Sequence, residues 1–237
     1  MNIENYDVKL CIFYAIAKFL RENSYLCRWL AKGKDMKISP PKFIRNMFPD
    51  LIWEIEDERG VYLTFDDGPT PGITEWILST LRRYDAKATF FVLGKNVEMY
   101  PDLYEKIVAD GHRVGNHTYS HQKGWIMPLE NYIADIDFAS DIVQSDLFRP
   151  PYARITPSQL RAVAKRYKVI MWSIISRDYN RKITGEMCLR GVLPHIKAGS
   201  IILFHDSEKS FANMSYALPK TLERIEEMGL KCKAIEL

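Results

Sequence analysis

The sequence alternates short apolar segments with amphipathic helical segments, and several of the apolar segments end in charged residues. From about residue 60 to the C-terminus, runs rich in β-forming residues are each followed by a stretch of helical periodicity. Repeated strand–helix units of this length favour a parallel sheet or a (β/α) barrel. In such folds the C-terminal strand ends meet at one rim, where active sites gather.

The clearest of these strand ends is the segment Val61–Pro69, which reads VYLTFDDGP. Its apolar run stops at two adjacent carboxylates, and Gly-Pro then turns the chain away. Because neighbouring residues of a strand point to opposite sides, we expect Asp66 and Asp67 to have different roles. The alternative interpretation is that the pair caps the helix that follows.

The pattern divides the chain into an N-terminal helical extension over residues 1–37 and a domain of alternating strands and helices over residues 38–237. The apolar segment 10–20 is too short to span a bilayer and lacks the features of a signal peptide. We therefore expect a cytoplasmic protein, with a peripheral membrane or exported location left open.

Strands are expected at about 51–55, 61–65, 88–93, 113–115, 168–175, 200–205 and 231–235, and helices at about 72–84, 101–110, 129–145, 157–166, 186–196 and 218–228.

Composition narrows the class of function. The 237 residues carry 33 basic and 30 acidic side chains, a net charge of +3, with no basic run that indicates a nucleic-acid surface. We expect no nucleic-acid partner and favour a small polar or sugar-like substrate. The four cysteines are scattered without CxxC spacing, so they indicate reduced thiols and neither a disulfide framework nor a zinc knuckle.

A second candidate site segment runs from Gly115 to His121 and contains histidines at positions i and i+4. On a helical turn, His117 and His121 sit one above the other, close enough to bind one ion. Asp67 completes a set of two histidines and one carboxylate, which binds catalytic zinc and other divalent metals, and Asp66 is then free to act as a base. The alternative is a pair of surface or packed histidines.

Three further segments place polar residues at strand ends. Arg149 precedes two prolines and Tyr152, and this stiff loop suits charge pairing with a carboxylate, although it is also typical of a plain connection. Asp178 follows the apolar run at 171–175. His205 ends the strand at 200–205, where it can titrate near neutral pH and serve as an acid or base.

These segments, in this order, resemble the polysaccharide deacetylase family of carbohydrate esterases (family 4), the group that includes NodB-like chitooligosaccharide deacetylases. The matches are TFDDGP at 64–69, H[ST]xxH at 117–121, RxPY at 149–152 and LxH at 203–205. The family motif DxxDW departs here, with Ile175 in place of its first Asp and Tyr179 in place of its Trp, while Asp178 is retained. This departure leaves open the shape and polarity of the substrate groove.

The resemblance implies a deformed (β/α) barrel of the NodB type that hydrolyses acetyl groups on sugars with a divalent metal. It assigns the metal to Asp67, His117 and His121, and the metal is expected to be zinc, with cobalt or nickel as alternatives. The expected substrate is an N-acetylated poly- or oligosaccharide of the chitooligosaccharide or peptidoglycan type.

The resemblance also implies roles for the remaining motif residues. Asp66, paired with Arg149, is the expected base, and the backbone N–H of Tyr152 is expected to bind the oxyanion. His205, oriented by Asp178, is the expected acid. The alternatives are an O-acetyl polysaccharide esterase and, because of the changed fourth motif, a non-catalytic carbohydrate-binding protein. Leu203 and Trp172 are expected to shape an apolar pocket for the acetyl methyl group.

Overall fold

A parallel sheet organises the part of the chain that the computed structural model describes, which is residue 45 and residues 48–237. The extension expected over 1–37, and the start at residue 38 of the expected domain, lie outside these residues. All ladders between the named strands are parallel, and the order is β1-β6-β5-β4-β3-β2-β8-β7, with β9 pairing to β2. The strands are β1 (Leu51–Ile52), β2 (Gly60–Asp66), β3 (Ala88–Val92), β4 (Arg113–Asn116), β5 (Leu147–Phe148), β6 (Lys168–Ile170), β7 (Ile174–Ile175), β8 (Ile201–His205) and β9 (Lys231–Cys232).

The sheet curls because one short stretch of chain joins its two ends. The single strand expected over 168–175 is wrong: it divides into β6 and β7, which lie near opposite ends of the strand order. At the break, the N–H of Met171 donates to the carbonyl of Ile52 (2.7 Å), while that of Ser173 donates to the carbonyl of Ile201 (3.0 Å). The chain thus changes neighbours from β1 to β8 within two residues. The result is a curled half-barrel, and the expected deformed (β/α) barrel is confirmed.

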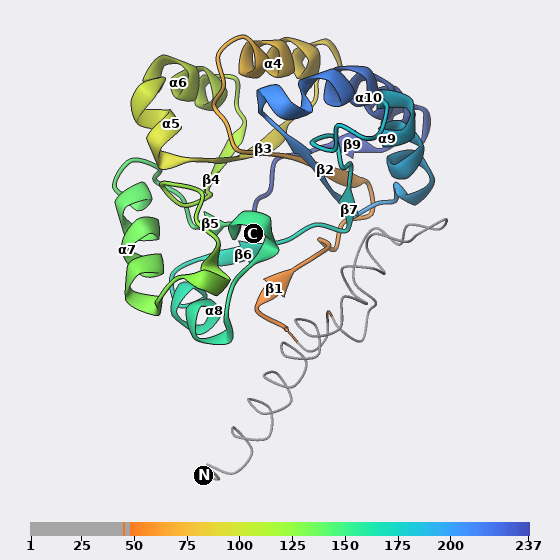
Figure 1. The fold of residues 1–237 in the computed structure, drawn as a ribbon. Coiled ribbons are helices and arrows are strands. Elements are labelled where there is room, and N and C mark those ends of the chain that lie inside the picture. The colour runs from red at the N-terminus through yellow and green to blue at the C-terminus, as the bar shows by residue number, and fades with distance from the viewer. Residues whose placement is uncertain (1–44, 46–47) are drawn as a thin grey trace. The chain divides into compact units, whose positions relative to one another are not determined.

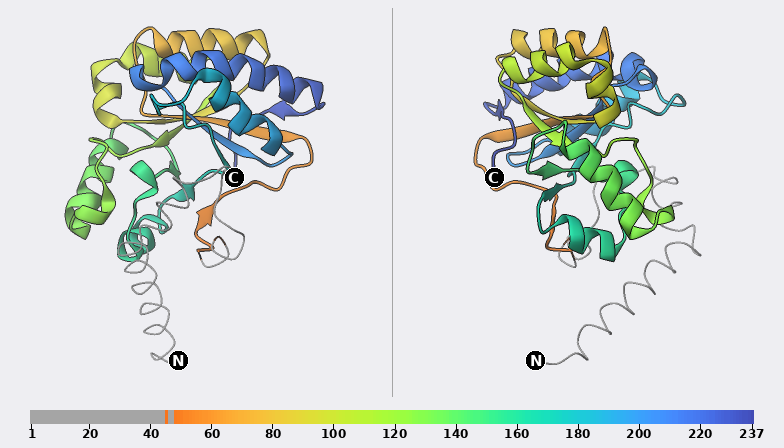
Figure 2. Two further views of the ribbon diagram at one scale, coloured as in Figure 1. Left: turned by 45° about the vertical axis from the view of Figure 1, so that its right-hand side comes forward. Right: turned by 90° about the vertical axis from the view of Figure 1, so that its left-hand side faces the viewer.

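Helices cover the outside of the curled sheet (Figures 1 and 2). Figure 2 shows α4 and α10 over the same face of the sheet, and α7 and α8 lie beside β4, β5 and β6. No helix in the described part of the chain is both long and apolar enough to cross a membrane. The helices are α4 (Ile73–Arg83), α5 (Gly94–Met99), α6 (Pro101–Ala109), α7 (Leu129–Ser140), α8 (Pro157–Val163), α9 (Gly185–Val192) and α10 (Glu208–Glu227), with 3₁₀ turns at Gly124–Ile126, Pro151–Ala153 and Leu193–His195.

The last helix differs most from its expected bounds. α10 begins at Glu208, well before the expected start at 218, and Pro219 lies inside it. A proline in a helix interior removes one backbone hydrogen bond and favours a break. Here the first half of the helix buries Ser210, Met214 and Ala217, so packing keeps the helix continuous across the proline. α7 also differs, because it ends at Ser140 and not near 145.

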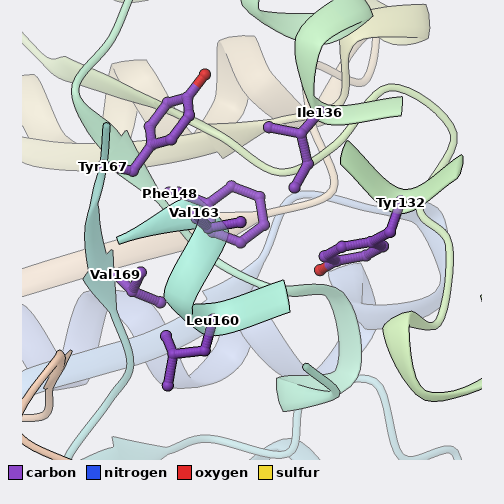
Figure 3. Close-up of a cluster of buried hydrophobic side chains, with 7 residues drawn as sticks. All are labelled: Tyr132, Ile136, Phe148, Leu160, Val163, Tyr167 and Val169. Carbon is purple, nitrogen blue, oxygen red and sulfur yellow. The ribbon is translucent and has the colours of Figure 1, made fainter. Parts of the chain in front are cut away.

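A cluster of buried side chains holds the strand that precedes Arg149. In Figure 3 the side chains of α7 and α8 surround Phe148 of β5, which is fully buried. This packing sets the position of the chain where the loop after β5 begins. The members of the cluster are Tyr132, Ile136, Phe148, Leu160, Val163, Tyr167 and Val169.

We predict that His112 makes the stability of the protein depend on pH. The ring is buried, and its Nδ1 accepts the N–H of Ala88 (3.2 Å). Burial and the nearby Lys87 lower the pKa of His112 to about 4, against a small opposing effect of Asp110. Because the pKa is depressed on folding, the stabilisation is complete above about pH 6.5 and is lost as the pH falls toward 4.

The measurement is the free energy of unfolding by denaturant between pH 7 and 4.5, for the wild type and His112→Asn. The wild type should lose roughly 2 kcal/mol more than the variant over this range. His195→Asn, at an exposed position, controls for the loss of an imidazole. Parallel curves for the wild type and His112→Asn would contradict the prediction.

Candidate active site

A buried ion pair between Asp66 and Arg149 lies at the end of β2. Asp66 is the last residue of β2, between β3 and β8, and Arg149 is fully buried. The guanidinium Nη1 of Arg149 donates to Asp66 Oδ1 (2.7 Å) and to Thr64 Oγ1 (2.8 Å). A hydrogen bond between a charged donor and a charged acceptor is shorter and stronger than one between neutral groups. Thr64 was not among the expected site residues, although its place in the TFDDGP motif was the available signal.

The remaining donors of Arg149 are also engaged. Nε donates to the carbonyl of Ile170 (3.1 Å) and Nη2 to that of Met171 (2.9 Å), at the break between β6 and β7. The guanidinium carbon lies 4.0 Å from the centroid of the Phe91 ring. Each polar contact of a buried charge reduces the cost of removing it from water. Arg149 therefore connects β2, β3, β5 and the chain closure of the barrel.

The backbone of Arg149 orients the first of the two histidines. The Nδ1 atom of His117 lies 2.7 Å from the carbonyl oxygen of Arg149. A carbonyl can only accept, so Nδ1 carries the hydrogen and Nε2 carries the lone pair of the neutral ring. Burial is the main cause that lowers the pKa of His117 to about 4, so the ring is neutral at pH 7. Its Nε2 lies 3.6 Å from Asp67 Oδ1.

His117 and His121 do not share a helical turn, so that expectation is wrong. They lie on a loop after β4, with φ of 67° at Thr118 and 59° at His121, and their ring centroids are 5.1 Å apart. Two local bonds shape the loop: the N–H of Thr118 donates to Asn116 Oδ1 (2.8 Å), and that of His121 donates to Thr118 Oγ1 (3.0 Å). Such side chain–backbone bonds replace those of a helix.

Asp67 completes a group of three ligand atoms. Its φ is 80°, just past the end of β2, so a turn of the backbone separates it from Asp66. The Oδ1 atom of Asp67 lies 3.1 Å from His121 Nε2, and the ligand atoms of Asp67, His117 and His121 all lie within 4.8 Å of one another. The idea that the two aspartates cap the next helix is wrong, because α4 has Gly72 as its N-cap.

The three residues fit a divalent metal ion. Asp67 Oδ1 is buried and receives no hydrogen bond of good geometry from the described residues. Burial raises the pKa of Asp67. The contact with His121 and the charges of the nearby histidines outweigh this effect and hold the pKa of Asp67 well below its usual range. A cation is what satisfies a buried anionic oxygen facing imidazole lone pairs. Two histidines and one carboxylate also leave coordination positions open.

His205 ends β8 and pairs in register with Asp66 of β2, and Asp178 holds it at two points. Asp178 Oδ1 lies 2.7 Å from His205 Nδ1, and Oδ2 accepts the backbone N–H of His205 (2.7 Å). Burial lowers the pKa of His205, but the charge and hydrogen bond of Asp178, with Asp67 and Asp66, raise it to about 9. The fully buried Asp178 also accepts the N–H of Tyr179 (2.9 Å).

Tyr152 lies on the rim beside His121. Its φ is 59° and that of Ala153 is 55°, conformations that non-glycine residues rarely adopt. The centroid of the Tyr152 ring lies 4.5 Å from that of His121. Among the residues that the structure describes, the backbone N–H of Tyr152 has no acceptor. A free N–H near Asp67, His117 and His121 is suited to donate a hydrogen bond to a substrate oxygen.

The two residues expected to shape an apolar pocket lie on different elements. Leu203 pairs with Thr64 in register, so its buried side chain shares the face of β2 and β8 that carries Asp66 and His205. Trp172 is half-buried at the break between β6 and β7, and the guanidinium carbon of Arg149 lies 5.7 Å from its ring.

Asp206 is a residue of the site that the sequence analysis missed. It is fully buried, and its Oδ2 accepts the hydroxyl of Thr74 (2.6 Å). A Cβ on Gly68 would lie 2.2 Å from Oδ2, so only glycine allows this approach. Burial and the nearby Asp67 raise the pKa of Asp206 to about 7, against the opposing bond from Thr74. The signal was an acidic residue directly after His205.

Comparison with known proteins decides the family. A family model described as polysaccharide deacetylase matches residues 54–172. The chain belongs to this family. The family resemblance seen in the four motifs is therefore confirmed.

The family relatives include peptidoglycan deacetylases. One from Bacillus cereus, named peptidoglycan-N-acetylglucosamine deacetylase, is 32% identical over 189 residues, which cover 76% of this chain and 89% of the relative. The peptidoglycan-N-acetylmuramic acid deacetylase PdaC from Bacillus subtilis is 32% identical over 91% of this chain. The matched region is 47% of the length of PdaC. In a second peptidoglycan-N-acetylglucosamine deacetylase from Bacillus cereus, the matched region is 65% of the length of that protein.

Solved structures agree on the fold. A peptidoglycan N-acetylglucosamine deacetylase, Bc1960, superposes with a TM-score of 0.75 at 28% identity, covering 83% of this chain and 95% of that one. A family 4 carbohydrate esterase from Streptomyces lividans, in complex with acetate, gives a TM-score of 0.68 at 29% identity, covering 75% and 93%.

We predict that Arg149→Lys destabilises the protein by roughly 2–5 kcal/mol. Lysine keeps the charge, but it cannot reach Asp66, Thr64 and the two carbonyls together, so buried polar groups lose their partners. The measurement is the free energy of unfolding in denaturant. Arg161→Lys, at an exposed position of α8, is the matched control and should change it by less than about 0.5 kcal/mol. Equal stability of the two variants would contradict the prediction.

Proposed function

We propose that this protein is a metal-dependent hydrolase that removes acetyl groups from N-acetylated sugars of a poly- or oligosaccharide. The observation that carries the proposal is the convergence of Asp67, His117 and His121 beside the Asp66–Arg149 pair. The relatives named as peptidoglycan-N-acetylglucosamine, peptidoglycan-N-acetylmuramic acid and chitooligosaccharide deacetylases support the substrate class.

Asp67, His117 and His121 would hold one divalent ion, which we propose to be zinc, with cobalt or nickel as alternatives. Such an ion polarises a carbonyl oxygen and lowers the pKa of water at its open position from about 16 toward 7. The hydrogen bond from His117 Nδ1 to the carbonyl of Arg149 fixes the ring with Nε2 toward the other ligands.

Asp66 acts as the base. Its Oδ1 is engaged by Arg149, while Oδ2 lies 3.8 Å from His117 Nε2, on the side of the ligand group. Oδ2 accepts a proton from the attacking water as the new carbon–oxygen bond forms at the acetyl carbonyl. The ion pair with Arg149 holds the carboxylate of Asp66 in place for this step.

Tyr152 stabilises the charge that develops on the carbonyl oxygen. Its backbone N–H is fixed by the two prolines before it and has no other acceptor in the described residues. A positioned donor of this kind contributes roughly 3 kcal/mol to transition-state stabilisation. The positive φ of Tyr152 costs about 1–3 kcal/mol, which the surrounding packing must offset.

His205 acts as the acid. It is protonated at neutral pH because Asp178 raises its pKa to about 9 despite the burial that lowers it. As the carbon–nitrogen bond breaks, His205 gives its proton to the departing nitrogen, and acetate and a free amine remain. Asp178 keeps the ring in place through the bonds to Nδ1 and to the backbone N–H.

The decisive test is release of acetate from N-acetylated chitooligosaccharides and peptidoglycan glycan strands, with zinc and with a chelator. Metal-loaded protein should release acetate, and the chelator should abolish release. Asp67→Asn should lose bound metal, measured by mass spectrometry of the protein-bound ion. Asp66→Asn should keep the metal and lose about 10²–10⁴ in kcat. No release with any acetylated glycan and any of the three metals would favour a non-catalytic binding protein.

A second test separates amide from ester hydrolysis. His205→Ala should lose about 10²–10⁴ in kcat on an N-acetylated sugar, because an amine cannot depart without a proton. On an activated phenyl acetate, whose leaving group needs no protonation, the loss should be less than about tenfold. Full activity of this variant on the amide would rule out His205 as the acid. Activity on O-acetylated glycans alone would favour an O-acetyl esterase.

A further inference from the structure

Two loops at the rim expose large side chains beside the ligand group. Trp125 and Ile126 in the 3₁₀ turn Gly124–Ile126 are 56% and 76% exposed, and Tyr152 in the turn Pro151–Ala153 is 53% exposed. We call this surface, with Lys123 and Arg154, the basic–aromatic ledge. Neighbouring exposed aromatic side chains on one surface are typical of a binding site.

The ledge is held in place without a ligand. Gly124 approaches the loop that follows β5 so closely that a Cβ on it would lie 2.4 Å from the carbonyl oxygen of Arg154. The Nε2 atom of Gln159 donates to the carbonyl of Gly124 (2.9 Å), and the indole Nε1 of Trp125 donates to that of Ile155 (3.3 Å). A preformed surface loses little conformational entropy when it binds.

Two cations lie on the aromatic rings of the ledge. The guanidinium carbon of Arg154 lies 5.3 Å from the ring centroid of Trp125 and 5.9 Å from that of Tyr152. Lys123 Nζ lies 5.2 Å from the same Tyr152 ring. Within the described part of the chain, neither cation has an acidic partner. Ring contacts hold the charges but do not neutralise them.

The ledge is continuous with the candidate active site through Tyr152. The backbone N–H of Tyr152 is the proposed oxyanion donor, and the centroid of the Tyr152 ring lies 4.5 Å from that of His121. A group bound to Lys123 and Arg154 therefore belongs to a sugar next to the one that reacts. A guanidinium matches the in-plane geometry of a carboxylate, and the exposed indole face of Trp125 suits the apolar face of a sugar ring.

We propose that Lys123, Trp125 and Arg154 form a subsite for a carboxylate-bearing sugar adjacent to the reacting N-acetyl sugar. The inference rests on the proposed function and deepens it, because it makes an acidic amino-sugar polymer the preferred substrate over a neutral one. The charge of the subsite is complementary to such a polymer, and the chemistry at the metal ligands is unchanged by it.

The test compares two oligosaccharides that differ only in charge. One carries an ether-linked carboxylate on alternate N-acetylated sugars, and in the other each carboxylate is converted to a neutral amide. With metal-loaded protein in about 20 mM salt, kcat/KM for the acidic form should exceed kcat/KM for the neutral form by about tenfold. Because salt screens exposed charges, this ratio of kcat/KM values should approach one in about 0.5 M salt. In the double variant Lys123→Gln, Arg154→Gln the ratio should be near one at low salt.

The control is the double variant Arg161→Gln, Lys165→Gln, which removes two exposed charges at the end of α8 and should keep the wild-type ratio. Thermal unfolding checks that both variants are folded. A wild-type ratio near one, or an equal fall in both variants, overturns the subsite.

Calorimetric binding of the same two oligosaccharides separates this inference from the proposed function. If neither oligosaccharide releases acetate, the proposed function fails, but tighter binding of the acidic form, lost in Lys123→Gln, Arg154→Gln, still supports the subsite. Equal dissociation constants for the two forms overturn it.

Discussion

The rest of the site depends on the buried charge of Arg149. Its guanidinium binds Asp66, Thr64 and two carbonyls at the barrel closure, while its own carbonyl accepts from His117. One residue thereby holds the carboxylate of the proposed base in place and sets the tautomer of a proposed metal ligand. A buried ion pair contributes little net stability, but removal of one partner is expensive. The main effect of the Asp66–Arg149 pair is geometric, because it links the end of β2 to the loop after β5.

Local backbone geometry does the remaining positioning. Asp67, Thr118, His121 and Tyr152 all have positive φ, which aims their side chains or N–H groups in directions that a regular strand or helix does not allow. Short hydrogen-bonded turns and the prolines before Tyr152 maintain these conformations. The strain is concentrated at the rim, as is common at functional sites, while β2, β3 and β5 are buried along their whole length.

The departure in the fourth motif changes packing around the proposed acid and keeps its partner. Asp178 retains both bonds to His205, and the ring of Tyr179 lies edge-on to that of His205 with centroids 5.0 Å apart. Ile175 pairs in register with Leu203 on the strand beside it. The substitution of an acidic residue by Ile175 therefore adds apolar surface next to β8 without removing a group that holds His205.

Local periodicity and motif spacing were enough to predict the alternation of strands and helices, the strand-end residues from Asp66 to His205, and the resemblance to the family. The break between β6 and β7, the loop geometry of His117 and His121, and the burial of Asp206 became visible in the folded structure. Folding also brings Lys123 and Arg154 onto the ring of Tyr152. These features depend on which segments become neighbours when the sheet curls, and hydrogen bonds between distant segments leave no periodic trace in the sequence.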